Sequence, residues 1–258
     1  MKVVLFCGGL GMRLRERSDR IPKPLAELGD QTLMWHLMKY YAHYGHKDFI
    51  LCLGYGGVAI KEYFLNYNEH LSNDFTFAKG GKEVKLAKKD IEDWNITFVD
   101  TGRNSNLGQR LLRVREYLKG EDTFLANYAD GLADLDLAKY VDDFNARGKT
   151  ACFVSVRVPQ TFHIVHADAE GYALKLEDVA TSSLRINGGF FVFKQQIFDY
   201  MRPGEELVVE PFTRLAEKRE LIAVPYDGFW HSMDTFKDQT RLNEMVQKGP
   251  APWQAWLK

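Results

Sequence analysis

A glycine-rich segment near the N-terminus is the strongest chemical signal in the sequence. Residues 8–13 read Gly-Gly-Leu-Gly-Met-Arg and directly follow the apolar run of residues 3–7. Because glycine has no Cβ, backbone N–H groups in such a loop can approach phosphate oxygens closely, so the segment predicts an anion cradle at the end of a strand. It is not a P-loop, because Gly-Lys-Ser/Thr is absent at the required offset, and the dinucleotide fingerprint Gly-x-Gly-x-x-Gly also fails.

Two cations accompany the loop. Arg13 ends the glycine segment, and Lys23 stands between Pro22 and Pro24. The prolines restrict the backbone around Lys23, so less conformational freedom is lost when its ammonium meets a phosphate. A plain tight turn would explain the glycines but not these cations, and we expect both side chains to neutralise phosphate charge.

Carboxylates at strand ends are the second chemical signal. Asp130 follows the apolar run of residues 124–128, which places it at the carboxyl end of a strand, where open α/β sheets bind ligands. Such a carboxylate can hold Mg²⁺ against phosphate oxygens. From the residues alone, a helix N-cap or turn aspartate explains Asp130 and Asp234 equally well.

Strands and helices alternate through the first half of the chain. Short apolar runs at residues 3–7, 49–53, 96–100 and 123–128 predict buried strands, and residues 32–45, 58–67 and 110–118 predict helices. This rhythm predicts a doubly wound, mostly parallel, Rossmann-like α/β sheet. The second half is richer in strands, at residues 151–158, 163–166, 172–176 and 190–193, and closes with helices at residues 211–218 and 236–247.

The charged interval of residues 72–95 predicts a hairpin-bearing excursion. A solvated flap of balanced charge is the favoured interpretation, and a subunit contact or active-site lid is the alternative. With no linker or internal repeat, we expect one domain over residues 1–258, with an NTP-binding part at 1–148 and an acceptor-binding part at 149–258.

Composition excludes several classes of protein. The chain has 258 residues, 45% of them hydrophobic, and 34 basic against 35 acidic side chains, a net charge of −1. That balance predicts binding neither to nucleic acid nor to an anionic membrane. The N-terminal apolar run is too short for a signal peptide, and no segment has the length of a membrane span. The three cysteines form no disulfide or zinc pattern, and we expect buried thiols and a cytoplasmic protein.

An ordered series of motifs resembles one enzyme family. The glycine segment followed by Lys-Pro is similar to the signature of sugar-1-phosphate nucleotidyltransferases. Further segments resemble the glucose-1-phosphate cytidylyltransferases of that family along nearly the whole chain, at residues 52–55, 60–64, 99–102, 130–134, 186–192, 228–235 and 251–253. The resemblance implies transfer of NMP from an NTP, with CTP favoured, to a sugar 1-phosphate, with glucose 1-phosphate favoured, and release of pyrophosphate. It also implies Mg²⁺ and a homo-oligomer.

The resemblance also assigns roles to positions of this chain. It implies catalytic Arg13 and Lys23; nucleotide-binding Gly8, Gly9, Gly11, Met12, Gly54, Gly102 and Arg110; acceptor-binding Asn187, Gly188 and Glu177; and the metal ligands Asp130 and Asp234. Position in the sequence, rather than the resemblance, adds Arg185 and Glu210 as candidates for contacts with the acceptor.

The acceptor side departs from the family pattern. Relatives commonly carry Glu-Lys-Pro where this chain has Glu177-Asp178-Val179, so an anion replaces a cation. Arg185 is a candidate to bind the phosphate instead, although a surface arginine is the favoured interpretation. Two alternatives stay open: the same chemistry on a heptose, cyclitol or phosphonate acceptor, and a catalytically silent relative that binds nucleotide.

Overall fold

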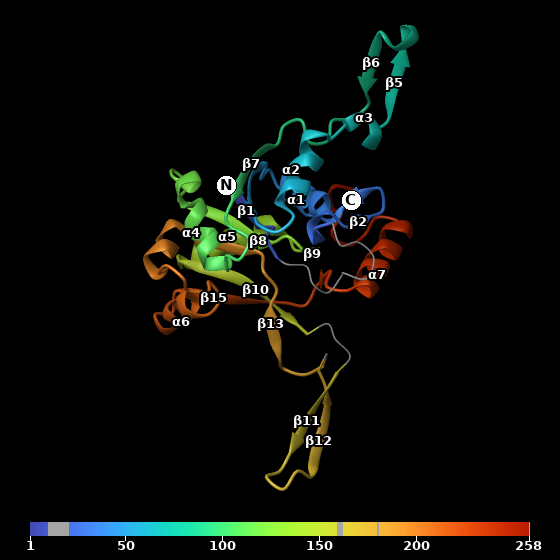
Figure 1. Ribbon diagram of the computed structural model, residues 1–258. Helices are drawn as coiled ribbons and strands as arrows, with labels where there is room; N and C mark the ends of the chain where they lie inside the picture. Colours follow the sequence, from blue (N-terminus) through green and yellow to red (C-terminus); the bar gives the residue numbers. More distant parts are fainter. Residues whose placement is uncertain (10–20, 159–161, 180, 258) are drawn as a thin grey trace.

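The computed structural model describes residues 1–9, 21–158, 162–179 and 181–257. An eight-stranded mixed sheet forms its centre, in the order β13-β10-β14-β8-β1-β4-β7, with β15 paired to β10 (Figure 1). The strands are β1 (Lys2–Phe6), β4 (Asp48–Leu53), β7 (Asn95–Asp100), β8 (Thr123–Tyr128), β10 (Ala151–Arg157), β13 (Arg185–Asn187), β14 (Phe191–Lys194) and β15 (Leu221–Tyr226).

The four strands of the first half run parallel. β1 pairs with β4 and β8, and β4 pairs with β7, all in parallel register. The second half joins this block through β14, which is antiparallel to both β8 and β10. The predicted doubly wound, mostly parallel α/β sheet is therefore confirmed, with its antiparallel strands in the second half.

Helices cover both faces of the sheet. Buried side chains from α1 (Leu33–His43), α5 (Leu137–Arg147) and α7 (Phe236–Gln247) pack on one face. Those of α4 (Leu107–Val114) and α6 (Glu210–Glu217) pack on the other. The strands serve both layers because their side chains alternate: Val3 and Leu5 face the first set of helices, and Val4 and Phe6 face the second.

Shorter elements complete the described chain. The remaining helices are α2 (Gly57–Leu65), α3 (Glu69–Ser72) and the 3₁₀ turns η2 (Lys23–Leu25), η3 (Lys79–Gly81), η4 (Arg115–Leu118), η5 (Gln195–Tyr200) and η6 (Ala255–Leu257). Two-stranded ribbons pair β2 (Glu27–Leu28) with β3 (Gln31–Thr32), and β9 (Gly131–Ala133) with β16 (Trp230–Ser232). None of the helices in the described ranges has the length and apolarity that a membrane crossing requires.

Two hairpins project from opposite sides of this body (Figure 1). One pairs β5 (Phe75–Ala78) with β6 (Glu83–Leu86) and is the hairpin predicted within residues 72–95. The other pairs β11 (His163–Ala167) with β12 (Ala173–Asp178). The first is anchored at its base by Asp90, a buried carboxylate that accepts hydrogen bonds from Trp35 Nε1 at 3.0 Å and Lys39 Nζ at 2.9 Å on α1.

Candidate active site

Lys23 lies between two carboxylates that come from distant parts of the sequence. Its Nζ donates to Asp130 Oδ2 at 2.6 Å and to Asp234 Oδ1 at 2.7 Å. The lysine opens η2, where Pro22 and Pro24 flank it as the sequence shows, and its side chain is only 15% exposed. The structure thus brings together the predicted catalytic lysine and both predicted metal ligands.

The β9–β16 ribbon explains why the two aspartates meet. Asp130 directly precedes β9, Asp234 follows β16, and Gly131 pairs with Ser232 in antiparallel register. The backbone N–H of Met233 donates to the Asp130 carbonyl at 2.9 Å, which closes the ribbon beside the carboxylates. Asp234 is then held by Asp238, which forms the α7 capping box with the N-cap residue Thr235 and whose Oδ2 accepts from the Asp234 N–H at 3.0 Å.

The charges around Lys23 favour its protonated form. Burial lowers the pKa of Lys23, but the Asp130 and Asp234 carboxylates raise it by more, so the net pKa lies above the ordinary lysine value. One ammonium therefore sits opposite two carboxylates, which leaves the cluster one negative charge in excess. Such a cluster can accept a further cation.

The two carboxylates fit Mg²⁺. Both oxygens already converge on one cationic atom, and Mg²⁺ in proteins uses one or two carboxylates and completes its octahedron with water and substrate phosphates. No group of three or more metal-ligating side chains occurs in the parts of the chain that the structure describes. Asp130 and Asp234 would therefore hold the ion together with ligands brought by the substrate.

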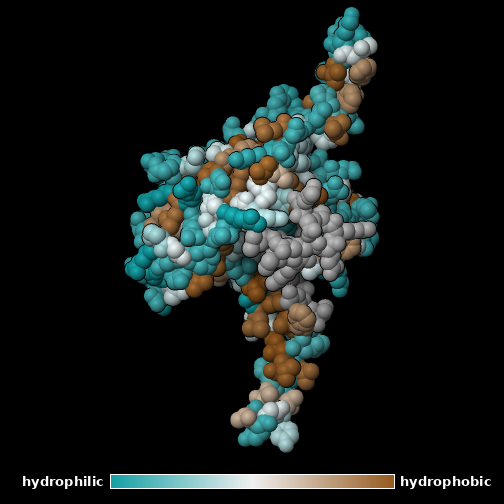
Figure 2. Space-filling model, viewed as in Figure 1, coloured by the Kyte–Doolittle hydropathy of each residue, from teal (hydrophilic) through white to brown (hydrophobic). Residues whose placement is uncertain are grey.

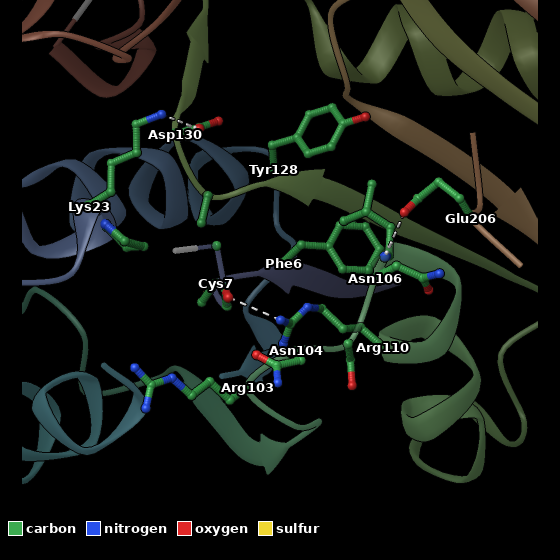
Figure 3. Close-up of a pocket in the computed structure, with 16 residues that line it drawn as sticks. Phe6, Cys7, Lys23, Arg103, Asn104, Asn106, Arg110, Tyr128, Asp130 and Glu206 are labelled. Carbon is green, nitrogen blue, oxygen red and sulfur yellow. Dashed lines mark hydrogen bonds and ion pairs between the residues drawn. The ribbon is translucent and has the colours of Figure 1, made fainter. Parts of the chain in front are cut away.

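A cavity of about 350 Å³ opens beside this cluster (Figure 3). Its walls come from the carboxyl ends of β1 and β8, the start of α4, and the segment before α6. They comprise Phe6, Cys7, Gly8, Gly9, Lys23, Pro24, Arg103, Asn104, Ser105, Asn106, Leu107, Arg110, Tyr128, Ala129, Asp130 and Glu206. The position at the carboxyl ends of parallel strands is the one that the sequence predicted.

Arg110 joins the ends of three neighbouring parallel strands. Its guanidinium donates to the carbonyl of Gly8 after β1 at 3.0 Å, to the carbonyl of Leu53 at the end of β4 at 3.2 Å, and to Thr101 Oγ1 after β7 at 2.7 Å. The side chain is buried, with the residue 4% exposed. We predicted a nucleotide contact for Arg110, which stays a prediction; the structure shows that its guanidinium fixes the cavity wall.

Two glycines, Gly8 and Gly54, pack directly against the guanidinium of Arg110. A Cβ added to Gly8 would lie 2.0 Å from Arg110 Nη1, and one added to Gly54 would lie 2.8 Å from the same atom. Only glycine leaves room for the guanidinium between these two loops. The sequence suggested close approach to phosphate as the reason for Gly8, and the structure adds close approach to an arginine.

The Asn187-Gly188 segment lies beside the cavity. Asn187 Nδ2 donates to the hydroxyl of Tyr128, a cavity residue, at 3.2 Å. Trp230 Nε1 donates to the Gly188 carbonyl at 2.8 Å, and a Cβ on Gly188 would lie 3.1 Å from that nitrogen. Packing therefore requires glycine at 188, and acceptor binding by this segment remains a prediction.

Other predicted acceptor residues do not line this cavity. Arg185 is engaged by Asp227 at 2.7 Å and the Ser155 carbonyl at 2.8 Å. Glu177 lies on the β11–β12 hairpin in ion pairs with Lys175 and His166.

Three more predicted positions have local roles, and three lie outside the described residues. Glu210 Oε2 accepts from the Glu206 N–H at 3.0 Å. Gly102 has a φ of 96° in the turn after β7. Gly9 is exposed at the cavity wall. The structure does not describe Gly11, Met12 or Arg13.

Sequence reasoning missed two polar residues of the cavity, Tyr128 and Glu206. Tyr128 ends an apolar strand and carried no separate signal. Glu206 stands in a loop without a motif, so only the fold brings it to the cavity.

Comparisons with known proteins agree with this geometry. The model of the family described as Nucleotidyl transferase matches residues 2–243. The chain is 41% identical to a glucose-1-phosphate cytidylyltransferase of Salmonella typhi and 37% identical to a probable one of Bacillus subtilis; each match covers 99% of this chain and 100% of the relative.

Solved structures share the fold. A putative glucose-1-phosphate thymidylyltransferase from Bacillus anthracis, solved with sucrose, matches with a TM-score of 0.70 at 16% identity over 96% of both chains. The HddC protein of Yersinia pseudotuberculosis, complexed with GMP-PN, matches with a TM-score of 0.67 at 18% identity over 95% of this chain and 99% of that one. The matching family model and the two full-length relatives show that the chain belongs to the nucleotidyl transferase family.

Proposed function

We propose that this nucleotidyltransferase joins the CMP part of CTP to glucose 1-phosphate and releases pyrophosphate. The names of the full-length relatives at 41% and 37% identity support this pair of substrates. The observation that carries the chemistry is the convergence of Lys23, Asp130 and Asp234 at the rim of one cavity.

The main obstacle to the reaction is repulsion between two anions. An oxygen of the acceptor phosphate attacks the α-phosphorus of the NTP, and the bond from that phosphorus to the β-phosphate's bridging oxygen breaks, so that pyrophosphate leaves. The reaction needs no covalent bond to the protein. The protein must position the reactants and offset their charge.

The lysine–aspartate cluster supplies that charge. When bound, Mg²⁺ would supply positive charge that offsets the charge of the phosphates. Asp130 and Asp234 would hold it, and Lys23, held between them without substrate, would turn its ammonium to the triphosphate. Arg13 is proposed to share this task, and Asn187 and Gly188 to orient the acceptor.

A panel of substrates tests the proposal. Each of the four NTPs is combined with glucose 1-phosphate and with heptose, cyclitol and phosphonate acceptors, and pyrophosphate release is measured. We expect the highest kcat/KM for CTP with glucose 1-phosphate. Turnover only with another acceptor would favour the alternative that Asp178 suggests, since this carboxylate at the end of β12 stands where relatives commonly have a lysine. Nucleotide binding without pyrophosphate from any pair would indicate a silent relative.

We also propose that the chain works as a cytoplasmic homo-oligomer. Its three cysteines are buried free thiols, as in a reducing compartment. Both hairpins carry an exposed apolar face: Phe75, Phe77 and Val84 on one, and Val165, Leu174 and Leu176 on the other (Figure 2). A lone two-stranded hairpin is marginal in water, so a second copy that covers these faces would stabilise them.

Light scattering after size exclusion tests this assembly. We expect a multiple of the 29.7 kDa chain mass. We expect a lower mass for Leu174→Lys, with Lys175→Ala as the control on the polar face. A monomeric wild-type protein would refute the proposal.

A further inference from the structure

Glu206 is a carboxylate in the wall of the candidate active site with fewer hydrogen bonds than it can accept. Its Oε2 accepts one long hydrogen bond, from the Leu107 N–H at 3.4 Å. Its Oε1 is buried and has no hydrogen-bond partner among the described residues. An ionised carboxylate can accept about four hydrogen bonds, and a buried acceptor without a partner is costly. A donor outside the described residues would satisfy this group.

The position of Glu206 in the cavity indicates what that donor belongs to. Figure 3 shows Glu206 on the far side of the cavity from Lys23 and Asp130, with the rings of Phe6 and Tyr128 between them. Burial raises the pKa of Tyr128, and the Glu206 and Asp130 carboxylates raise it further, so the phenol lies within electrostatic range of both. The cavity therefore has two acidic ends: one at Asp130, where we propose that the metal binds, and a second at Glu206.

The charge of Glu206 excludes phosphate from its end of the cavity. A carboxylate repels the triphosphate, whereas the Lys23 ammonium and a Mg²⁺ ion held by Asp130 and Asp234 would attract it to the other end. The carboxylate accepts from the N–H of Leu107, the first residue of α4, and so lies at the N-terminal end of that helix. What fits beside Glu206 is an uncharged part of the nucleotide that carries N–H or O–H donors, against the flat surfaces of the Phe6 and Tyr128 rings.

We propose that Glu206 is a specificity residue that accepts a hydrogen bond from the nucleoside part of the NTP. The donor is an amino group of the base or the 2′-hydroxyl of the ribose, and the two share the same chemistry towards a carboxylate. An amino group would distinguish cytosine from uracil, because uracil presents a carbonyl oxygen at that position and an acceptor would face an acceptor. The proposal rests on the proposed function and deepens it by assigning nucleoside selection to one side chain.

Glu206→Gln tests the proposal because it keeps the shape of the side chain and exchanges one acceptor for a donor. The glutamine amide can turn its oxygen to the Leu107 N–H and its NH₂ to the cavity. We measure kcat/KM for CTP, UTP and 2′-deoxy-CTP with the wild type, with Glu206→Gln and with Glu217→Gln. Glu217 is an exposed carboxylate on α6, outside the cavity, and serves as the matched control.

The expected result is a loss of about 10- to 100-fold in kcat/KM for CTP in Glu206→Gln, the scale of one hydrogen bond to a charged group. If the base supplies the donor, UTP loses less than CTP or improves, and the ratio of CTP to UTP falls by a similar factor. If the ribose supplies it, the wild type already discriminates against 2′-deoxy-CTP and the variant does not. Glu217→Gln should match the wild type throughout.

Unchanged ratios of CTP to UTP and of CTP to 2′-deoxy-CTP would overturn the proposal, as would an effect on the acceptor KM alone. Calorimetric Kd values for the three nucleotides with Mg²⁺ give the same comparison without turnover. Failure of the proposed reaction is therefore distinguishable from failure of Glu206 to bind. Glu206→Asp, which withdraws the carboxylate by one methylene group, should weaken binding of the same nucleotide and keeps the test available if the glutamine variant is unstable.

Discussion

Replacement of Gly8 by alanine tests whether Arg110 holds the cavity wall. The new Cβ would lie 2.0 Å from Arg110 Nη1 and 2.3 Å from its Cζ, so the guanidinium must leave its place. The clash itself is cheap to relieve, because the end of an arginine is flexible. The cost comes from the hydrogen bonds that the guanidinium loses when it moves.

The magnitude follows from those bonds. Loss of the bonds to the Gly8 carbonyl and to Thr101 Oγ1, at about 1.5 kcal/mol or more each, costs about 3 kcal/mol. The third bond adds little, because the Leu53 carbonyl keeps its hydrogen bond from Thr101 Oγ1. Alanine restricts the unfolded chain and offsets up to about 1 kcal/mol of this. We therefore expect Gly8→Ala to lower the free energy of unfolding by about 2 kcal/mol, which corresponds to about 4–8 °C in Tm for a chain of this size.

Gly9→Ala is the matched control, because a Cβ there meets no heavy atom of the described residues within 4 Å. Urea denaturation of the two single variants, of Arg110→Ala and of Gly8→Ala/Arg110→Ala completes a double-mutant cycle. Gly8→Ala should cost little once Arg110 is gone. An equal cost in both backgrounds, or equal stability of Gly8→Ala and Gly9→Ala, would refute the reasoning.

Three further predictions follow from single contacts. Lys23→Ala should lower turnover by roughly 10²–10³, the scale of one electrostatic group in a transition state, and near wild-type pyrophosphate release would rule out its role. Asp90→Ala removes the buried carboxylate that anchors the β5–β6 hairpin, and it should lower the free energy of unfolding, measured by urea denaturation, by about 3 kcal/mol. The control Asp93→Ala breaks an exposed ion pair and should lower it by less than about 1 kcal/mol. Equal losses in the two variants would contradict this prediction. Burial lowers the pKa of His36 in the folded protein below the ordinary histidine value of about 6.5. The neutral ring therefore contributes its full share to the free energy of unfolding above about pH 6.5, and this share is lost as the pH falls below that value. In NMR titration its ring should titrate below the ordinary value of about 6.5, and titration at or above that value would disprove the assignment.

The sequence predicted those parts of the molecule whose signals are local. Buried strands, the hairpin within residues 72–95 and the place of Asp130 at the end of a strand all follow from short patterns at one place in the chain. The partner of Asp130 came from resemblance, because nothing local to Asp234 says that β16 pairs with β9. The pattern of a strand also does not show which strand it pairs with. The sequence therefore gave no sign that β14 lies between β8 and β10 and runs antiparallel to both.

The roles of Arg110 and Glu206 depend on convergence in space. From the sequence, Arg110 is a polar residue on a predicted helix. Only the structure shows that its guanidinium forms hydrogen bonds at the ends of β1, β4 and β7. Glu206 becomes significant only when the segment before α6 is placed beside Tyr128. The predicted strands at residues 163–166 and 172–176 likewise gave no sign that β11 and β12 leave the main sheet as a separate hairpin, because alternation of polar and apolar side chains is the same in both settings.

One crystallographic measurement tests the central claim, that Lys23 holds a cation position which the substrate's metal takes over. Crystals with a non-hydrolysable CTP analogue and Mn²⁺ in place of Mg²⁺ would locate the metal by its anomalous signal. We predict one peak within coordination distance of both Asp130 and Asp234, with the Lys23 ammonium moved from the carboxylates to the triphosphate. A metal bound elsewhere, with Lys23 still between the two aspartates, would contradict the account.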